Sequence, residues 1–308
     1  MDKVITVIQT VLPVFLALAL GMMCRSRNFL SREGVDALKK VVINLTLPFV
    51  LVNAFATAEY SAAALILPAL MFLVCCLALG LGFLAVRIFK IKGRLTAFLA
   101  SGFEAGMLGY ALFLLLFPDV SVSKFALPDI GQTLFVFTLY KILLSGKRDW
   151  KSIGKDMVTT PILWAVVAGI LIGATGLYGK MEQWGVSGVL NACTDFLSAP
   201  TGMIILLTVG YDLVIKEIPW KKTAGVIVMR LVIVAICYAV SLLLNRTLLD
   251  SMLFEGAMLL MLILPPPYVI PVFADEPAER VSVSSALSAM TLVTVVLFAA
   301  LSVFVGMQ

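Results

Sequence analysis

Long apolar runs separated by short polar segments occupy almost the entire chain. A helix that crosses a bilayer needs about 20 mostly apolar residues, and ten runs come close to that length or exceed it. They are Val4–Cys24, Val41–Ala56, Ala62–Phe89, Leu95–Phe117, Ile130–Leu144, Val158–Leu177, Val189–Leu213, Ala224–Leu244, Met252–Phe273 and Val281–Met307. The pattern predicts an all-α integral membrane protein with ten transmembrane helices, called spans 1 to 10 below.

The composition agrees with this pattern. Hydrophobic residues make up 61% of the 308 residues, charged residues make up 13%, and the mean hydropathy is +1.08. A soluble domain is nearer half apolar and one quarter charged, so the sequence leaves no room for one. The first run is about 20 residues long, beyond the roughly 7–15 residues of a signal-peptide core. We therefore expect it to be an uncleaved first span.

The residue types narrow the chemistry. All five cysteines lie in or beside apolar runs and the chain has no histidine, which argues against a disulfide framework and against Cys/His metal sites. Without a histidine, an HExxH motif or a Gly-x-Ser-x-Gly motif, an integral-membrane enzyme is disfavoured, and we expect no cofactor or metal. Nucleic acid is not an expected partner, because the basic residues form short clusters separated by apolar runs.

Basic residues lie almost entirely in every second loop. Seventeen occupy the loops after the odd-numbered spans: Arg25, Arg27, Arg32, Lys39, Lys40, Arg87, Lys90, Lys92, Arg94, Lys147, Arg148, Lys151, Lys155, Lys216, Lys221, Lys222 and Arg280. Four lie on the opposite side: Lys3, Lys124, Lys180 and Arg246. By the positive-inside rule both termini face outward, and we expect the chain in a bacterial inner membrane.

The span count predicts an inverted repeat. Residues 1–155 hold five spans that start outside, and residues 156–308 hold five that start inside. Leu45-Thr46-Leu47-Pro48 in span 2 and Leu197-Ser198-Ala199-Pro200 in span 7 match weakly at comparable places. Inverted repeats are the usual architecture of secondary transporters.

Spans 4 and 9 occupy equivalent places in the two halves, and both are interrupted. The interrupting residues are Gly102, Gly106 and Gly109 in span 4 and Pro265, Pro266, Pro267 and Pro271 in span 9. Three consecutive prolines remove three backbone donors and cannot continue an α-helix. The freed carbonyls must face protein or a water-filled cavity.

Paired interruptions in corresponding helices indicate a binding site near the membrane midplane. We predict that Gly106–Tyr110 and Pro265–Pro267 are non-helical and lie close together. The alternative is that glycine and proline are simply common in membrane helices.

Charged residues within spans need a partner or a role, because each costs a few kcal/mol or more. Glu104 lies about nine residues into span 4, roughly 14 Å deep. Arg230 lies within span 8, Asp195 lies within span 7, and Lys141 is near the inner end of span 5.

Two interpretations of these charges stay open. In one, Glu104 and Arg230 form a structural ion pair. In the other, Glu104 exchanges a coupling proton, while Arg230 and Lys141 attract an anionic substrate through charge and, for arginine, a planar fork. The half-helices beginning near Tyr110 and after Pro267 would add partly positive ends that favour an anion.

Three motifs in the correct order resemble the auxin efflux carrier family, including its bacterial, malate- or malonate-permease-like members. Span 2 carries Asn44-Leu-Thr-Leu-Pro48, similar to the family's Asn-x-x-x-Pro signature. Span 4 carries Glu104-Ala-Gly106-Met-Leu-Gly109-Tyr110, similar to its Asn-x-Gly-x-x-Gly-x-Pro stretch. The run from Pro265 through Ala274, with Ser285-x-x-Ser288-x-x-Thr291 after it, is similar to the carboxy-terminal signature.

The resemblance implies a sodium/proton antiporter-like fold in which broken spans 4 and 9 cross. It also implies a scaffold of spans 1, 2, 6 and 7, a mobile unit of spans 3–5 and 8–10, elevator-type transport, and small carboxylates as substrates. The chain departs from the family at three places: Glu104 stands at an asparagine position, Tyr110 near a proline position, and Val269 at the second crossover asparagine.

These observations predict a secondary active transporter of a small organic anion, coupled to protons or sodium and acting in the lipid bilayer as a monomer or homodimer. A cation or proton exchanger is the alternative. The predicted substrate-binding residues are Asn44, Glu104, Gly106, Gly109, Tyr110, Lys141, Arg230, Pro265, Pro266, Pro267 and Val269, and the predicted coupling-ion residues are Glu104 and Asp195.

The charge pattern makes the first testable prediction. Single cysteines placed at Met1 and at Gln308 in a cysteine-free background should react with a membrane-impermeant maleimide added to intact cells, because both ends face outward. A cysteine in the Lys147–Lys155 loop is the control that should stay protected. Protection of either terminus would mean that the span count is wrong.

Overall fold

The computed structural model describes residues 2–58, 66–91, 93–145, 159, 161–213, 215, 218–249, 251–273 and 277–307, and its regular structure is entirely helical there. Six helices in this part of the chain are long and apolar enough to cross a membrane. A further pair, Pro161–Ala174 and Leu177–Gln183, is bent by 62° and adds a seventh crossing if it forms one span. The protein is an all-α, multi-pass membrane protein.

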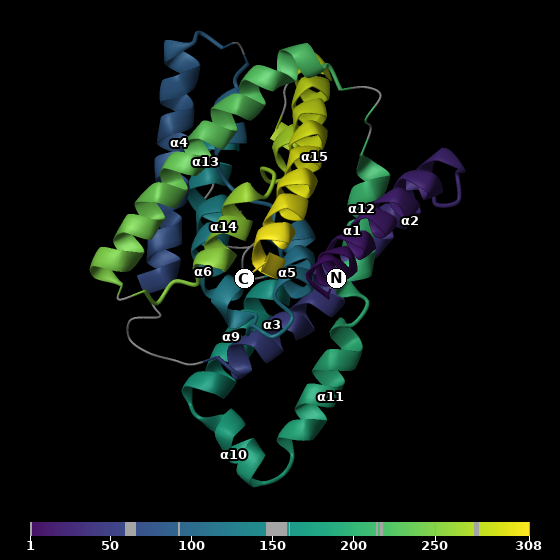
Figure 1. Cartoon of the computed structure of the whole chain (residues 1–308), viewed down its shortest axis with the longest axis vertical. Coiled ribbons are helices and arrows are strands. Elements are labelled where there is room, and N and C mark those ends of the chain that lie inside the picture. Colours follow the sequence, from purple (N-terminus) through teal and green to yellow (C-terminus); the bar gives the residue numbers. More distant parts are fainter. Residues whose placement is uncertain are drawn as a thin grey trace.

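The first half of the chain contains long helices joined by irregular turns (Figure 1). Its α-helices are α1 (Asp2–Ser26), α2 (Arg32–Val41), α3 (Leu47–Ala56), α4 (Ile66–Ile88), α5 (Tyr110–Leu116), α6 (Ser123–Phe135) and α7 (Lys141–Ser145). Two π-helical turns make longer helices from these pieces: Val42–Thr46 joins α2 to α3, and Val136–Tyr140 joins α6 to α7.

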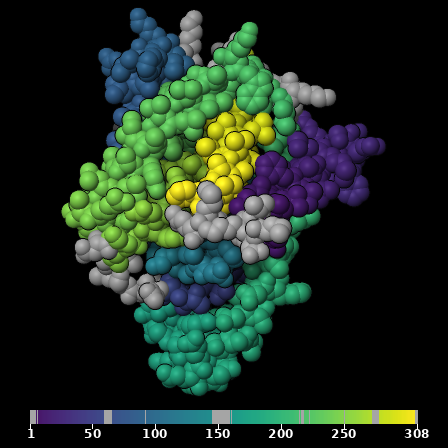
Figure 2. All heavy atoms as spheres, viewed as in Figure 1, coloured from purple at the N-terminus to yellow at the C-terminus, as the bar shows by residue number. Residues whose placement is uncertain are grey.

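The second half contains α9 (Pro161–Ala174), α10 (Leu177–Gln183), α11 (Ser187–Ser198), α12 (Thr201–Asp212), α13 (Trp220–Leu248), α14 (Glu255–Ile263) and α15 (Pro277–Met307). The space-filling view shows α10 and α11, in teal, projecting from one end of the molecule (Figure 2). Large apolar side chains lie on the outer surface, including Phe196 at 80% exposure and Leu73 at 64%. Such a surface suits lipid rather than water.

Helices far apart in the sequence pack closely. The first helix, α1, runs against α12, α3 packs against α9 and α11, and α4 packs against α6 and α13. The α1–α12 contact depends on small residues, since a Cβ at Gly21 would lie 2.1 Å from the Leu207 carbonyl oxygen and one at Gly210 would lie 2.2 Å from the Leu18 carbonyl oxygen. Glycine permits this backbone approach, as is common between membrane helices.

Both predicted interruptions occur, but one is displaced. Pro265–Pro267 is non-helical, as predicted, and lies between α14 and a 3₁₀ turn at Ile270–Phe273. In span 4 the non-helical residues are 101–104. Gly106–Tyr110 is helical, because Ala105–Gly109 forms a π-helical turn that continues into α5, and the prediction for this segment is wrong.

The displacement has a local physical cause at Gly102. This residue adopts a φ of +70°, in the left-handed region that glycine enters without steric cost. A Cβ at Gly102 would lie 2.8 Å from Cγ of Pro267. The chain therefore turns at the glycine that also touches the prolines, and the half-helix begins at Ala105, not near Tyr110.

This geometry predicts the effect of Gly102→Ala. The left-handed backbone costs a non-glycine residue about 1–2 kcal/mol, and the added methyl collides with Pro267. The variant should melt at a clearly lower temperature than wild type in detergent. Gly188→Ala is the matched control, since a Cβ there meets nothing within 4 Å and alanine favours a helix. Equal melting of the two variants would contradict the close crossing.

Candidate functional site

The two interrupted segments are joined by hydrogen bonds. The Glu104 N–H donates to the Pro265 carbonyl at 2.9 Å, and the Tyr268 N–H donates to Oε2 of Glu104 at 2.7 Å. Tyr268 is the first residue after the three prolines that has an N–H to give. The prediction that the two interruptions lie close together is confirmed.

Several carbonyls around the prolines accept hydrogen bonds from donors outside the helix that the prolines end. A buried carbonyl without a donor costs about 1–3 kcal/mol, and three prolines cannot supply any. The donors come from other segments or from just beyond the prolines: Thr294 Oγ1 to Ile263 at 2.6 Å, Arg230 to Leu264 at 2.7 Å, the Glu104 N–H to Pro265 at 2.9 Å, and the Ile270 N–H to Pro267 at 3.3 Å.

Arg230 on α13 links both interruptions. Its side chain is buried, with 4% exposure for the residue. The guanidinium donates to the carbonyls of Leu99 at 2.8 Å, Gly102 at 3.0 Å and Leu264 at 2.7 Å. It also lies 5.1 Å from the centre of the Phe103 ring, a cation–π distance. One side chain therefore fastens the span 4 interruption to the span 9 interruption.

Glu104 and Arg230 do not form an ion pair in the described part of the chain, so the interpretation as a structural pair is wrong. The pairing fails because the donors of Arg230 are directed at carbonyls, while Glu104 accepts from Tyr268. The basic group that interacts electrostatically with Glu104 is Lys39. A role for Arg230 in binding substrate stays a prediction.

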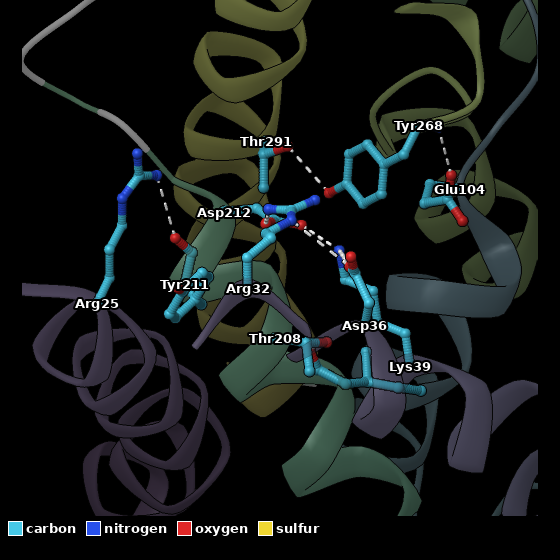
Figure 3. Close-up of polar contacts among 11 residues, drawn as sticks. Arg25, Arg32, Asp36, Lys39, Glu104, Thr208, Tyr211, Asp212, Tyr268 and Thr291 are labelled. Atoms are coloured by element: carbon cyan, nitrogen blue, oxygen red, sulfur yellow. Dashed lines mark hydrogen bonds and ion pairs between the residues drawn. The ribbon is translucent and has the colours of Figure 1, made fainter. Parts of the chain in front are cut away.

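A charged cluster joins α2 to the end of α12 (Figure 3). Arg32 and Lys39 each bond to a different oxygen of the Asp212 carboxylate at 2.5 Å, and Arg32 also lies 3.5 Å from Asp36. Nearby, Arg25 donates to the carbonyl of residue 211 at 3.3 Å. Cations at the carboxyl end of a helix complement its partial negative charge.

Tyr268 lies between this cluster and the crossing (Figure 3). Its hydroxyl is 3.0 Å from Oγ1 of Thr291 on α15, and its N–H bonds to Glu104. Asp212 interacts electrostatically with Tyr268, as Lys39 does with Glu104. The candidate site is therefore the region where Lys39 and Asp212 face Tyr268 and Glu104.

Sequence reasoning missed part of this site. It used Lys39 only to assign orientation, took Asp212 as the edge of an apolar run, and gave Tyr268 no role. One signal was available: an acidic residue at the end of span 7, on the same side of the membrane as the basic loop before span 2. The pairing of Tyr268 with Glu104 had no sequence signal, because it depends on how the interruptions cross.

The other predicted residues surround the crossing to different degrees. Tyr110 is buried, and its hydroxyl donates to Asp129 at 2.8 Å. Gly109 packs tightly, since a Cβ there would lie 2.7 Å from Leu264. Gly106 is half-buried on the π-helical turn, and Val269 is 41% exposed beside the prolines.

Three predicted residues lie away from these contacts. Asn44 is exposed and donates to the Lys40 carbonyl at 2.8 Å, and Lys141 is half-buried at the start of α7. Asp195 is exposed on α11 and lines a cavity of about 380 Å³, of which Glu104 is not a lining residue. The structure thus groups Glu104, Arg230 and the prolines, and leaves Asp195 elsewhere.

Comparison with known proteins adds two matches. A family model described as "Membrane transport protein" matches residues 6–155. An "Uncharacterized transporter" of Methanothermobacter thermautotrophicus is 25% identical over 212 residues, which is 67% of either chain. The chain is similar to these transporters over the segment that contains Glu104.

The contacts of Arg230 predict a loss of stability in Arg230→Lys. Lysine keeps the charge but lacks the planar fork, so it leaves carbonyls without donors at about 1–3 kcal/mol each. The melting temperature should fall well below that of Arg246→Lys, the matched control on the same helix, where the side chain is 67% exposed. Wild-type stability combined with lost substrate binding would assign Arg230 to the substrate instead.

Proposed function

We propose that the chain is a secondary active transporter of a small organic anion and a member of the membrane transport protein family, the family of the auxin efflux carriers. The observation that carries the proposal is the crossing of two interrupted segments around a carboxylate held by a backbone N–H. Interrupted helices that meet in this way are the usual binding sites of secondary transporters.

We propose a ten-span architecture made of two inverted repeats, 1–155 and 156–308. The six long apolar helices and the bent α9–α10 pair supply seven spans. Three interrupted segments supply the rest: Arg32–Ala56, Thr96–Leu116 and Glu255–Phe273. Each contains short helices separated by π-helical, 3₁₀ or non-helical residues, so none passes as one long apolar helix.

Packing supports a division into a scaffold and a mobile unit. In the proposed scaffold α1 packs against α12, and α3 packs against α9 and α11; in the proposed mobile unit α4 packs against α6 and α13, and α13 packs against α14 and α15. The contact between α1 and α15 crosses the boundary between the two units. Lys39 on α2 and Leu47 on α3 approach Glu104 and Gly106 from the scaffold side. Elevator-type movement of the crossing along this boundary would expose the site to each side in turn.

The charges at the crossing favour a carboxylate substrate. The Tyr268 N–H already binds a carboxylate oxygen, and Lys39, paired with Asp212, adds an electrostatic interaction with Glu104. When Glu104 takes up a proton, the site loses its own negative charge, and the Tyr268 N–H becomes available to a substrate carboxylate. Proton and anion would then bind together, which is the linkage that symport requires.

A cation or proton exchanger is the second candidate. Asp119 and Asp195 both line the cavity of about 380 Å³ between α3, α11 and the α5–α6 turn, and none of its described lining residues is basic. This acidic lining favours cations at that place. The Tyr268 N–H that binds a carboxylate oxygen favours anions at the crossing, so the anion transporter is the preferred proposal.

The proposal predicts that Glu104→Gln uncouples transport from the proton gradient. Glutamine resembles the protonated acid, so substrate should still bind while the pH dependence is lost. The measurement is uptake of radiolabelled malate and malonate into proteoliposomes, with and without an inward proton gradient. Glu182→Gln, on the exposed face of α10, is the matched control and should behave like wild type.

Two outcomes would count against this assignment. If Glu104→Gln keeps the full response to the gradient, the coupling site lies elsewhere and Asp195→Asn is tested next. If neither carboxylate is taken up by wild-type protein while sodium or proton exchange is measurable in the same vesicles, the exchanger is the better description.

A further inference from the structure

A second carboxylate lies buried behind the crossing. Asp129 on α6 is 8% exposed. Its Oδ2 accepts from the Tyr110 hydroxyl at 2.8 Å, its Oδ1 lies 3.4 Å from Nε2 of Gln132, and Thr133 contributes a further hydrogen bond. Within the described chain no cation lies within ion-pair distance of it. A carboxylate ionised at membrane depth without a countercharge costs a few kcal/mol or more.

Gln132 connects this carboxyl group to the interruption in span 4. The side chain is buried at 5% exposure, and Nε2 donates to the Phe103 carbonyl at 2.6 Å, one residue before Glu104. Its amide oxygen, Oε1, is buried and has no hydrogen-bond partner among the described residues. The amide nitrogen of Gln132 contacts both the Asp129 carboxyl group and the backbone of the span 4 interruption.

We propose that Asp129 is a second proton-binding site of the transporter, that it carries a proton in the conformation seen here, and that Gln132 links it to the interruption in span 4. A proton on Asp129 removes the charge that no cation of the described chain compensates. The inference extends the proposed function, because it assigns a second proton carrier to the same mobile unit.

A cavity lies near the start of the helix that carries Asp129. The cavity of about 380 Å³ is lined by residues 118–122, and α6 begins at Ser123. Asp129 therefore lies about 10 Å along the helix from Val122, at 1.5 Å per residue. The cavity is also lined by Asp119 and Asp195, whose negative charges would attract protons toward it.

The neighbouring titratable groups make Asp129 and Glu104 interdependent. Those that interact with Asp129 are Tyr110 on α5, Cys75 on α4 and Glu104 at the interruption. Two other helices, α3 and α14, also pack against α6. The described part of α3 carries no titratable side chain. The titratable residue of α14 is Glu255, which is the first residue of that helix and lies 3.7 Å from Arg246. Two nearby carboxylates disfavour simultaneous ionisation, so protonation of one changes the proton occupancy of the other.

Infrared difference spectroscopy of the purified protein in liposomes tests the assignment directly. At mildly acidic pH, wild type should show a carbonyl stretch of a protonated carboxylic acid that Asp129→Asn removes and the control Glu182→Gln retains. Asparagine is neutral and nearly isosteric, and its oxygen can still accept from Tyr110, so folding should persist. If Asp129→Asn leaves the band unchanged, Asp129 is not protonated and the proposal fails.

Two further arms keep the test decisive. Gln132→Leu should shift the frequency of the same band, because it removes the amide next to the acid. An unshifted band would overturn the link between Gln132 and Asp129. This variant also provides the test if Asp129→Asn does not fold. Removal of the band by sodium at constant pH, without a response to pH, would overturn the proton assignment in favour of a metal cation.

Failure of the transport proposal would look different. A band that depends on Asp129 in a protein that moves no carboxylate would support this proton site and contradict the anion transporter. Carboxylate uptake that responds to the gradient, with no band assignable to Asp129, would support the transporter and overturn the second site.

Discussion

The centre of this protein is organised by the need to give every backbone carbonyl a hydrogen-bond donor where water is scarce. Two helices are interrupted there, and the three prolines cannot supply donors to their own segment. Arg230 meets much of this need by donating to carbonyls from both interruptions, and Thr294 and the Glu104 N–H supply others. The crossing is thus held by contacts from several helices, and its geometry depends on all of them.

The same constraint explains the position of Glu104. Tyr268 follows the prolines with an N–H that has no helical acceptor, and the carboxylate of Glu104 accepts it. A carboxylate therefore already occupies a place where a transporter of organic anions would bind substrate. In the function we propose, protonation of Glu104 and binding of substrate are linked because both act on this one contact.

Charge has two uses along this chain. Arg32 and Lys39 belong to the basic loop that orients the protein, and in the folded structure they also meet Asp212 at the end of α12. The carboxylates that lie deepest, Glu104 and Asp129, have hydrogen-bond donors but no ion-pair partner within the described residues. Groups of this kind at membrane depth are candidates for ion or proton binding by default.

The sequence by itself determined that the protein is an all-helical membrane protein and that Pro265–Pro267 cannot be regular helix, while its placement of the span 4 interruption at Gly106–Tyr110 is wrong. The first two conclusions follow from local chemistry, because apolar length and missing N–H groups do not depend on the rest of the fold. Tertiary structure decided which glycine turns the chain. The turn is at Gly102 and not at Gly106, because Gly102 packs against Pro267. It also decided the partners of Arg230, the pairing of Tyr268 with Glu104 and the burial of Asp129, since each requires helices distant in sequence to converge at one point.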